Sequence, residues 1–461
     1  MTSPLGGFWT VDTAKLQFGG FFPTLNLRPN AVLWSRTTAL VFAPSFVFEM
    51  SETKSGKAIH EGWLLGVLAA IQFTAVLDFM IIMPLGPQYM RVFHIDPSQF
   101  GLIVSAYAIA AGIAGIIAGF FIDRFDRKRA MLVLYAGFTL GTLFCAMAPS
   151  YQTLVAARVV AGAFGGVTMG LVMAVIGDVI PEIRRGRAMG IVMSSFSVAS
   201  ICGVPIGLYL ANEMDWHIPF YALAGLCVFV TLGVAKVMPS LRGHIDRVAQ
   251  QPPAEMMAGI LKEASNRRAL MFMATLICTG FCVFPFLATY MVKNVGLTEK
   301  QLPWIYICGG VCTLVSMNLI GRWADRAGKR RVFTIMMLAS MIPVLIVTNL
   351  PHVAVWIALT ISTIFMVCSS GRIVPAMAML TASVEPHQRG GFMSINSSVQ
   401  QLSSGVAAWL SGVIIGQSGR HMTRFGIVGG LSVIFGLAAI YLARFLKTTG
   451  AGTAVQGIVE T

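Results

Sequence analysis

Twelve apolar stretches, each long enough to cross a bilayer, follow one another from residue 62 to residue 443. An α-helix crosses about 30 Å of hydrocarbon in about 20 residues. Apolar residues make up 56% of the chain and charged residues 11%, which excludes a water-compatible surface. The sequence therefore predicts an all-α membrane protein with twelve transmembrane helices, at 62–88, 99–122, 130–148, 152–178, 188–212, 217–238, 269–292, 301–321, 332–350, 353–382, 391–416 and 423–443.

Lysine and arginine lie mostly on one side of these predicted helices. Of the 33 basic residues, 23 lie in the connections after even-numbered helices or at the two ends of the helical region. The opposite side carries five, which are Arg91, Lys293, Lys300, Arg420 and Arg424. Since cytoplasmic loops retain positive charge, we expect both termini to be cytoplasmic. The membrane that we expect is a bacterial inner membrane. The net charge of +14 reflects this topology and attraction to anionic lipid, and gives no reason to infer nucleic-acid binding.

Cysteine and histidine give no sign of a metal or cofactor site. The sequence has no C-x-x-C motif, and its seven histidines lie in loops or near the ends of predicted helices. We therefore expect no cofactor and no metal. A membrane enzyme acting on lipid-linked substrates would need clustered intramembrane acids, histidines or a nucleophile pair. A membrane sensor would be expected to carry an appended soluble domain. The sequence lacks these features, so we expect neither class of protein.

The segment 1–49 differs from the rest of the chain, because its apolar runs are short and interrupted by proline and glycine. It lacks the basic start, single apolar core and small-residue cleavage site of a signal peptide. From Met50 the chain reads as a short polar leader that runs into the first helix. We expect translation to start at Met50; a disordered extension is the alternative.

An internal repeat organises the helices into two halves. The segments Gly119–Arg129 and Gly321–Arg331 share G-x-x-x-D-R followed by basic residues, and Arg185–Ile191 matches Arg389–Ile395. Both matches are offset by about 200 residues, which indicates duplication of a six-helix unit. The predicted parts are a leader (1–61), two six-helix bundles (62–238 and 269–446), a cytoplasmic loop between them (239–268) and a cytoplasmic tail (447–461).

Two motifs resemble signatures of the major facilitator superfamily. Gly119–Arg129 is similar to its loop signature G-x-x-x-D-R-x-G-R-[KR], except that Asp126 replaces the second glycine. Leu154, Arg158 and Gly162 in the fourth helix resemble the signature of proton-coupled members. The resemblance covers residues 60–446 and implies two pseudo-symmetric six-helix bundles around a central cavity.

A third motif points to exchange. Gly203-Val204-Pro205-Ile206-Gly207 resembles a loosened form of the antiporter signature, and with Leu77–Pro84 it is similar to the twelve-span drug:proton antiporter branch, including sugar-efflux-like members. Proline removes a backbone donor and bends the helix, and Gly203 and Gly207 present a surface without bulk. An ordinary kink in a membrane helix is the alternative reading.

The basic loops and nearby acids predict a cytoplasmic gate. Asp123 at a helix end can pair with arginine or lysine and form a latch that breaks when the halves rock, with Arg187 and Arg389 as possible partners. A plain positive-inside anchor is the alternative. The predicted gate residues are Gly119, Asp123, Arg124, Arg127, Asp178, Arg187, Asp325, Arg326 and Arg389.

Three ionisable residues, Asp78, Arg158 and Arg372, lie inside predicted helices, where charges are costly and usually functional. Burial favours the protonated form of Asp78 and nearby Arg158 favours the ionised form, so we expect Asp78 to be the proton-coupling carboxylate. A fixed structural ion pair is the alternative. Arg372 is expected to anchor an acceptor-rich substrate, or else to cap carbonyls at a broken helix.

The predicted function is export of a small organic molecule in exchange for protons, by a monomer working through alternating access. A symporter or uniporter of the same fold is the nearest alternative. Substrate contacts are expected in a central cavity lined by Gln72, Phe73, Tyr107, Arg372, Asn396 and Gln400.

Overall fold

A computed structural model describes residues 50–51, 59–242, 253–385, 388–419 and 421–446. The chain divides into two compact units, 1–47 and 48–461, and every described residue belongs to the second. The predicted start at Met50 concerns the segment 1–49, which lies outside the described residues, as does the predicted tail.

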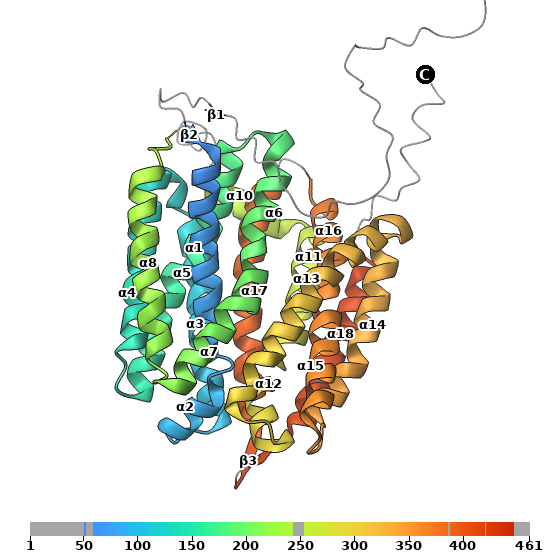
Figure 1. The fold of residues 1–461 in the computed structure, drawn as a ribbon. Coiled ribbons are helices and arrows are strands. Elements are labelled where there is room, and N and C mark those ends of the chain that lie inside the picture. Colours follow the sequence, from blue (N-terminus) through green and yellow to red (C-terminus); the bar gives the residue numbers. More distant parts are fainter. Residues whose placement is uncertain (1–49, 52–58, 243–252, 386–387, 420, 447–461) are drawn as a thin grey trace, which may run out of the picture. The chain divides into compact units, whose positions relative to one another are not determined.

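The first half of the described chain is helical apart from one short pair of strands (Figure 1). Strands β1 (Met50–Ser51) and β2 (Ile59–His60) pair antiparallel. The helical elements are α1 (Glu61–Ile81), α2 (Gly86–Val92), α3 (Pro97–Gly119), η1 (Ile122–Arg124), α4 (Arg127–Ala146), α5 (Tyr151–Val179), α6 (Glu182–Val198), η2 (Ala199–Gly203), α7 (Val204–Glu213) and α8 (Ile218–Val237).

The second half begins with α10, a short helix from the connection between the halves. A hairpin of strands β3 (Gly416–Ser418) and β4 (His421–Thr423) precedes the last helix. The helical elements are α10 (Pro253–Lys262), α11 (Ala264–Phe281), α12 (Phe284–Tyr290), η3 (Met291–Val295), η4 (Glu299–Gln301), α13 (Leu302–Ala327), α14 (Lys329–Thr348), α15 (Val355–Gly371), α16 (Ile373–Ser383), α17 (Arg389–Ile414) and α18 (Phe425–Ala443).

Eleven helical segments within the described ranges are long and apolar enough to cross a membrane. Each matches a predicted helix; α6 to α7, α11 to α12 and α15 to α16 count as continuous segments. The remaining predicted helix, the eleventh at 391–416, is α17, which has 26 residues but contains many serine, asparagine and glutamine side chains. Because α17 packs against both α3 and α11, four of its polar side chains are buried in protein, namely Asn396, Ser398, Ser404 and Ser411. The predicted twelve-helix fold is confirmed.

The first helix is shorter than predicted. It ends at Ile81 rather than at residue 88, and a turn leads into the separate helix α2. Pro84 has no backbone N–H to donate, and it disfavours the helical conformation of the residue before it. The apolar run continues through this break, so hydropathy alone did not reveal it. As a result Asp78 lies in the last turn of α1.

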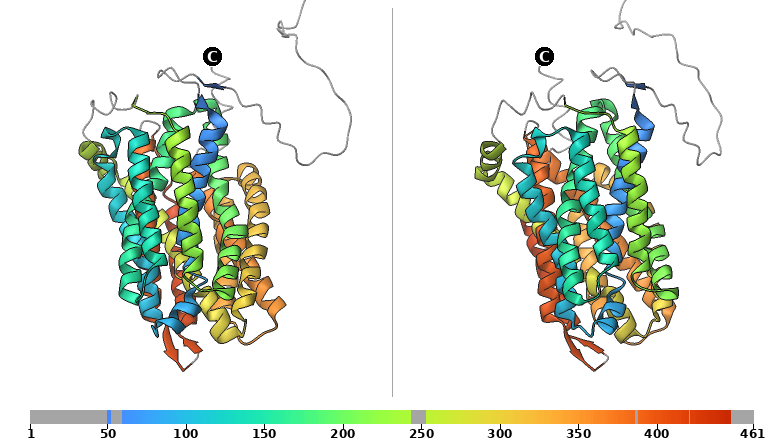
Figure 2. Two further views of the ribbon diagram at one scale, coloured as in Figure 1. Left: turned by 60° about the vertical axis from the view of Figure 1, so that its left-hand side comes forward. Right: turned by 90° about the vertical axis from the view of Figure 1, so that its left-hand side faces the viewer.

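The two halves meet along α3 and α17, which lie side by side over much of their length (Figure 2). Small residues make this approach possible. A Cβ atom on Gly412 would lie 2.8 Å from the carbonyl oxygen of Pro97, and one on Gly405 would lie 3.1 Å from the backbone nitrogen of Ile109. A second contact joins η2 and α7 of the first half to α13 of the second. Two seams of small residues therefore hold the halves together.

Candidate functional site

A buried ion pair joins two helices of the first half. Asp78 Oδ2 on α1 lies 2.7 Å from Arg158 Nη1 on α5, and both side chains are 0% exposed. The hydroxyl of Thr142 on α4 donates to the other carboxylate oxygen of Asp78 at 3.2 Å. Three helices therefore converge on one carboxylate. Removing one partner of such a pair generally costs about 3–5 kcal/mol.

Tyr107 belongs to this buried cluster. Its ring centroid lies 4.3 Å from the guanidinium carbon of Arg158, and the side chain is fully buried. The ring also packs at 5.4 Å against Phe79, whose own ring lies 5.7 Å from Phe281 of the second half. Tyr107 was predicted to line the substrate cavity. In the structure its contacts connect the ion pair to the boundary between the halves.

Glycines on α5 allow Tyr107 to reach Arg158. A Cβ atom on Gly162 would lie 2.2 Å from the carbonyl oxygen of Tyr107, and one on Gly165 would lie 2.5 Å from its hydroxyl. Both distances are shorter than any tolerable contact, so α3 can approach α5 only because these positions lack side chains. Gly162 of the proton-coupled signature therefore has a packing role beside the ion pair.

Replacing Gly162 with valine should destabilise the protein, because the added atoms would push α3 away from α5. Overpacking of this kind typically costs about 1–3 kcal/mol. We expect the melting temperature in detergent to fall by several degrees. Gly170→Val on the same helix is the matched control, because a Cβ atom there meets nothing within 4 Å. Equal melting temperatures for the two variants would contradict this packing role.

The ion-pair cluster has unused hydrogen-bonding capacity. Arg158 Nε, Arg158 Nη2 and the hydroxyl of Tyr107 are buried and have no hydrogen-bond partner within the described part of the chain. Unpaired buried polar groups are costly, and they mark places where water or a ligand gains affinity. The cluster can therefore accept a further acceptor group without first losing a protein hydrogen bond.

Helix α2 covers this end of the first half. Tyr89 on α2 is fully buried and packs against Trp216 with ring centroids 5.2 Å apart. Burial raises the pKa of Tyr89 well above its ordinary value, and the nearby Arg158 opposes this rise only partly. Tyr89 is therefore neutral at physiological pH. Asp78 therefore lies near the end of α1 that α2 and its Tyr89 side chain cover, rather than in the middle of a long helix.

The antiporter-like kink packs against the turn of α1 that carries Asp78. A π-helical turn at η2 comes directly before Pro205 at the start of α7. A Cβ atom on Gly203 would lie 2.9 Å from Leu77 Cδ1, and one on Gly207 would lie 2.1 Å from Ile81 Cδ1. The two glycines therefore contact residues that lie on either side of Asp78 in the sequence. A shift of the kinked helix would therefore change the packing around the Asp78–Arg158 ion pair.

At the opposite end of the first half, Arg127 joins two of the predicted gate acids. Its Nη1 lies 2.6 Å from Asp123 Oδ1 and its Nε lies 2.9 Å from Asp178 Oδ2. The Arg127 side chain is 6% exposed, whereas Asp123 and Asp178 are 39% and 30% exposed. The bridge links η1, α4 and α5. We call Asp123, Arg127 and Asp178 the acid-bridge, and its end of the molecule the Asp123 end.

Asp126, which replaces a glycine of the loop signature, caps α4. Its backbone has a φ of −56°, so no glycine is required, and its carboxylate accepts from the backbone N–H groups of Lys128 and Arg129. Partial burial opposes ionisation, but hydrogen bonds from Ser240, the two backbone groups and Arg242 lower the pKa of Asp126. The substitution therefore adds a helix cap rather than loosening the turn.

The second copy of the loop signature is arranged differently. Asp325 and Arg326 are exposed near the end of α13, and no ion pair involving Asp325 exists among the described residues. Gly328 has a φ of +91°, which explains why this copy keeps its glycine.

The remaining predicted gate residues make other contacts. Arg124 and Arg187 are exposed, and exposed Arg389 donates to the carbonyl oxygen of Val384 at 3.3 Å. A Cβ atom on Gly119 would lie 3.8 Å from the sulfur of Met257, so Gly119 faces α10. Neither Arg187 nor Arg389 pairs with Asp123 in this structure; Arg127 does so.

Ion pairs join the two halves at the other end of the molecule, which we call the Glu299 end. Arg91 on α2 forms two hydrogen bonds with Glu299 of η4, at 2.6 and 3.2 Å. Lys300 lies 2.7 Å from Glu213 of α7, and Asn212 donates to the backbone carbonyl of Glu299. We call these five residues the outer clamp. At the Asp123 end, the ion pairs among described side chains join residues of the first half to one another, to Glu61 or to Arg242, and none of them joins the two halves.

Replacing Glu299 with glutamine should loosen the outer clamp, because it removes a charge pair that joins the halves. An exposed pair is worth up to about 1 kcal/mol, so the population open at this end should rise by up to about fivefold. Spin labels at the exposed positions His94 and Thr298 would report longer distances in the variant. Glu255→Gln, an exposed acid on α10, is the control. Unchanged distance distributions would rule out a clamp role for Glu299.

The other predicted cavity residues come from α1, α17 and the junction of α15 and α16. Gln72 and Asn396 are buried, and the side-chain oxygen of each lacks a hydrogen-bond partner among the described residues. Asn396 is seven residues before Ser403, whose carbonyl faces Cys278 of α11, so Asn396 lies on the side of α17 toward α11. Phe73 and Gln400 are partly buried. Arg372 contacts Ser340 on α14.

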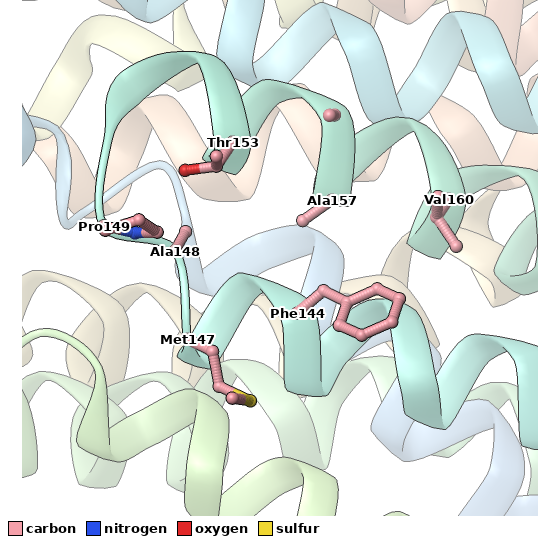
Figure 3. Close-up of a pocket in the computed structure, with 8 residues that line it drawn as sticks. Phe144, Met147, Ala148, Pro149, Thr153, Ala157 and Val160 are labelled. Atoms are coloured by element: carbon pink, nitrogen blue, oxygen red, sulfur yellow. The ribbon is translucent and has the colours of Figure 1, made fainter.

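A pocket of about 310 Å³ lies between the end of α4 and the start of α5 (Figure 3). Its lining is apolar except for Thr153, and it comes only from these two helices and their connection. Phe144 and Met147, which contribute to it, are more than half exposed. Because no residue of the second half lines it, this pocket is not the predicted central cavity.

Comparison with known families agrees with this architecture. The model of the Major Facilitator Superfamily matches residues 68–284 and 270–456, which together cover most of the chain. The chain belongs to the major facilitator superfamily. It is therefore a multi-pass membrane transporter and not an enzyme, and secondary transport is the activity typical of this family.

Curated relatives within the superfamily align over nearly their whole lengths. The uncharacterized MFS-type transporter YceJ of Bacillus subtilis is 26% identical over 384 residues, covering 83% of this chain and 95% of the relative. The inner membrane transport protein YdhP of Escherichia coli K12 is 23% identical over 363 residues, covering 77% and 90%.

Solved structures show the same fold at low sequence identity. A bacterial homolog of the human lysosomal transporter Spinster, in an inward-facing and unoccupied conformation, superposes with a TM-score of 0.69 at 14% identity, over 84% of this chain and 99% of that one. A D-xylose–proton symporter superposes with a TM-score of 0.68 at 16% identity, over 84% and 98%.

Several functional candidates were not foreseen from the sequence. Thr142 and the residues of the outer clamp are among them. Thr142 is one of many hydroxyl residues in membrane helices and carries no distinguishing pattern. The clamp had one available signal, since Arg91 and Lys300 are two of only five basic residues on their side of the predicted membrane.

Proposed function

We propose that this transporter exports a small organic molecule across a bacterial inner membrane in exchange for protons. The single observation that carries this proposal is the fully buried contact between Asp78 and Arg158. Burial favours a neutral carboxyl group and the guanidinium favours a carboxylate, so a small change in their separation shifts the balance between the two forms. A proton carrier needs this kind of switch.

The two ends of the molecule support alternating access. The outer clamp joins the halves at the Glu299 end, and the acid-bridge lies within the first half at the Asp123 end. With the Asp123 end on the cytoplasmic side, as the basic residues predict, both termini are cytoplasmic and this conformation is closed to the outside. Opening requires the outer clamp to break while contacts form at the Asp123 end.

The antiporter-like kink favours exchange over uniport. Gly203 and Gly207 press on Leu77 and Ile81, on either side of Asp78. Rocking of the kinked helix would therefore change the packing around the carboxylate, which couples its protonation to the conformational change. We place the substrate between the halves, near the ring of Phe79 and the polar positions Gln72, Asn396 and Gln400.

A substrate screen in everted membrane vesicles tests this proposal. Everted vesicles that contain the transporter are acidified inside by respiration, and candidate organic molecules are added outside while internal pH is followed. A true substrate should be accumulated and should release protons from the vesicle interior in the same period. Accumulation of a substrate with no proton movement, and no effect of an uncoupler, would contradict proton exchange.

A further inference from the structure

Arg372 is a buried cation inside the second half. It lies at the junction of α15 and α16 and is 3% exposed. Its Nη1 donates to the hydroxyl of Ser340 on α14 at 2.9 Å and lies 3.5 Å from the sulfur of Met337. A Cβ atom on Gly280 of α11 would lie 3.6 Å from Nη2. The guanidinium therefore points toward α14 and α11, within one half.

The charge of Arg372 is not balanced by an acid. No acidic side chain in the described ranges pairs with it, in contrast to Arg158 with Asp78. Its Nε is buried without a hydrogen-bond partner, as is the hydroxyl of Ser369 one turn earlier on α15. Burying an unpaired ion costs several kcal/mol, so a negative charge at this point would be strongly stabilising.

The groups left unpaired around Arg372 suit an anion. Ser340 already donates to the carbonyl of Met337 and accepts from Arg372, so the groups left over are hydrogen-bond donors. Arg372 also makes side-chain hydrogen bonds rather than capping carbonyls at the helix junction.

We propose that Arg372 and Ser369 bind a small inorganic anion, such as chloride, inside the second half, with Ser340 holding the guanidinium in place. The anion neutralises the guanidinium and accepts from its Nε and from the Ser369 hydroxyl. The Arg372–Ser340 contact makes the position of the guanidinium depend on α14 as well. The proposed site uses residues of the second half alone, and it stabilises that half because the anion binds the folded state.

Thermal unfolding of the purified full-length protein in detergent tests the site, without substrate or pH gradient. At equal ionic strength, sodium chloride or bromide should raise the melting temperature by several degrees over sodium gluconate, in a saturable manner. Arg372→Met should lose this response, and Ser340→Ala should need several-fold more chloride for half the effect. Ser411→Ala, which removes another buried hydroxyl without a described partner, should respond like the wild type.

Three results would overturn the proposal: no difference between chloride and gluconate in the wild type, an unchanged response in Arg372→Met, or a response to acetate alone. If Arg372→Met does not fold, crystals of the wild type grown in bromide decide the matter. An anomalous peak beside Arg372 is expected, and its absence there would count against the site. None of these outcomes depends on proton coupling, so they leave the proposed function to its own test.

Discussion

Asp78→Asn should abolish uphill transport driven by a pH gradient and leave downhill exchange of substrate measurable. Asparagine keeps nearly the volume of aspartate but cannot change its charge, so the switch between neutral and ionised forms is lost. We expect substrate accumulation in proteoliposomes to fall at least tenfold with an imposed gradient. Without a gradient the flux should fall much less.

The ratio of these two fluxes separates coupling from structure. Asp78→Asn leaves Arg158 buried without its counter-ion, so the amount of folded transporter will also fall. A purely structural role would lower both fluxes by the same factor. Thr142→Val is the matched control, because it removes one hydrogen bond to Asp78 while keeping the carboxylate. If Asp78→Asn responds fully to the gradient, then Asp78 is only the structural partner of Arg158.

Arg127→Gln should slow turnover by about tenfold or more while leaving substrate binding close to normal. Arg127 is the buried member of the acid-bridge and holds two carboxylates that come from η1 and α5. Its loss leaves Asp123 and Asp178 near each other without a shared cation, and like charges repel. The conformation that depends on the bridge would be destabilised. Turnover of a radiolabelled substrate and its equilibrium binding are the two measurements.

Controls for Arg127→Gln come from the same loop. Arg129→Gln removes the same charge from an exposed side chain and should have little effect. Asp123→Asn should have an intermediate effect, because Asp178 still pairs with Arg127 and Asp123 is 39% exposed. Turnover of Arg127→Gln at the wild-type rate would show that the acid-bridge is a static anchor and not a gate.

The membrane fold could be predicted from the sequence because the bilayer determines both the hydropathy and the length of a helix that crosses it. The same reasoning failed at Pro84, where the apolar run continues although the helix ends. It held at α17, where length and the repeat were informative even though polar side chains lower the hydropathy. Hydropathy indicates whether lipid or water surrounds a segment. The helix ends where backbone hydrogen bonds can no longer form, and hydropathy does not indicate that position.

The ion pair could be anticipated because intramembrane charges are few and need partners. Its surroundings could not. Thr142 and Tyr107 are neutral, and their contacts with Asp78 and Arg158 depend on how closely α3, α4 and α5 approach. Arg372 shows the limit of this reasoning, because the sequence revealed a buried charge but not the direction in which it points.

Reversal of an imposed pH gradient in proteoliposomes is the most direct test of proton exchange. The wild-type transporter is reconstituted, and uptake of a substrate from the vesicle screen is measured with the lumen acidic, equal or alkaline relative to the outside. Proton exchange predicts accumulation above the equilibrium level only when the lumen is acidic. Accumulation only with an alkaline lumen would indicate symport, uptake that ignores the gradient would indicate uniport, and either result would contradict the proposed exchange.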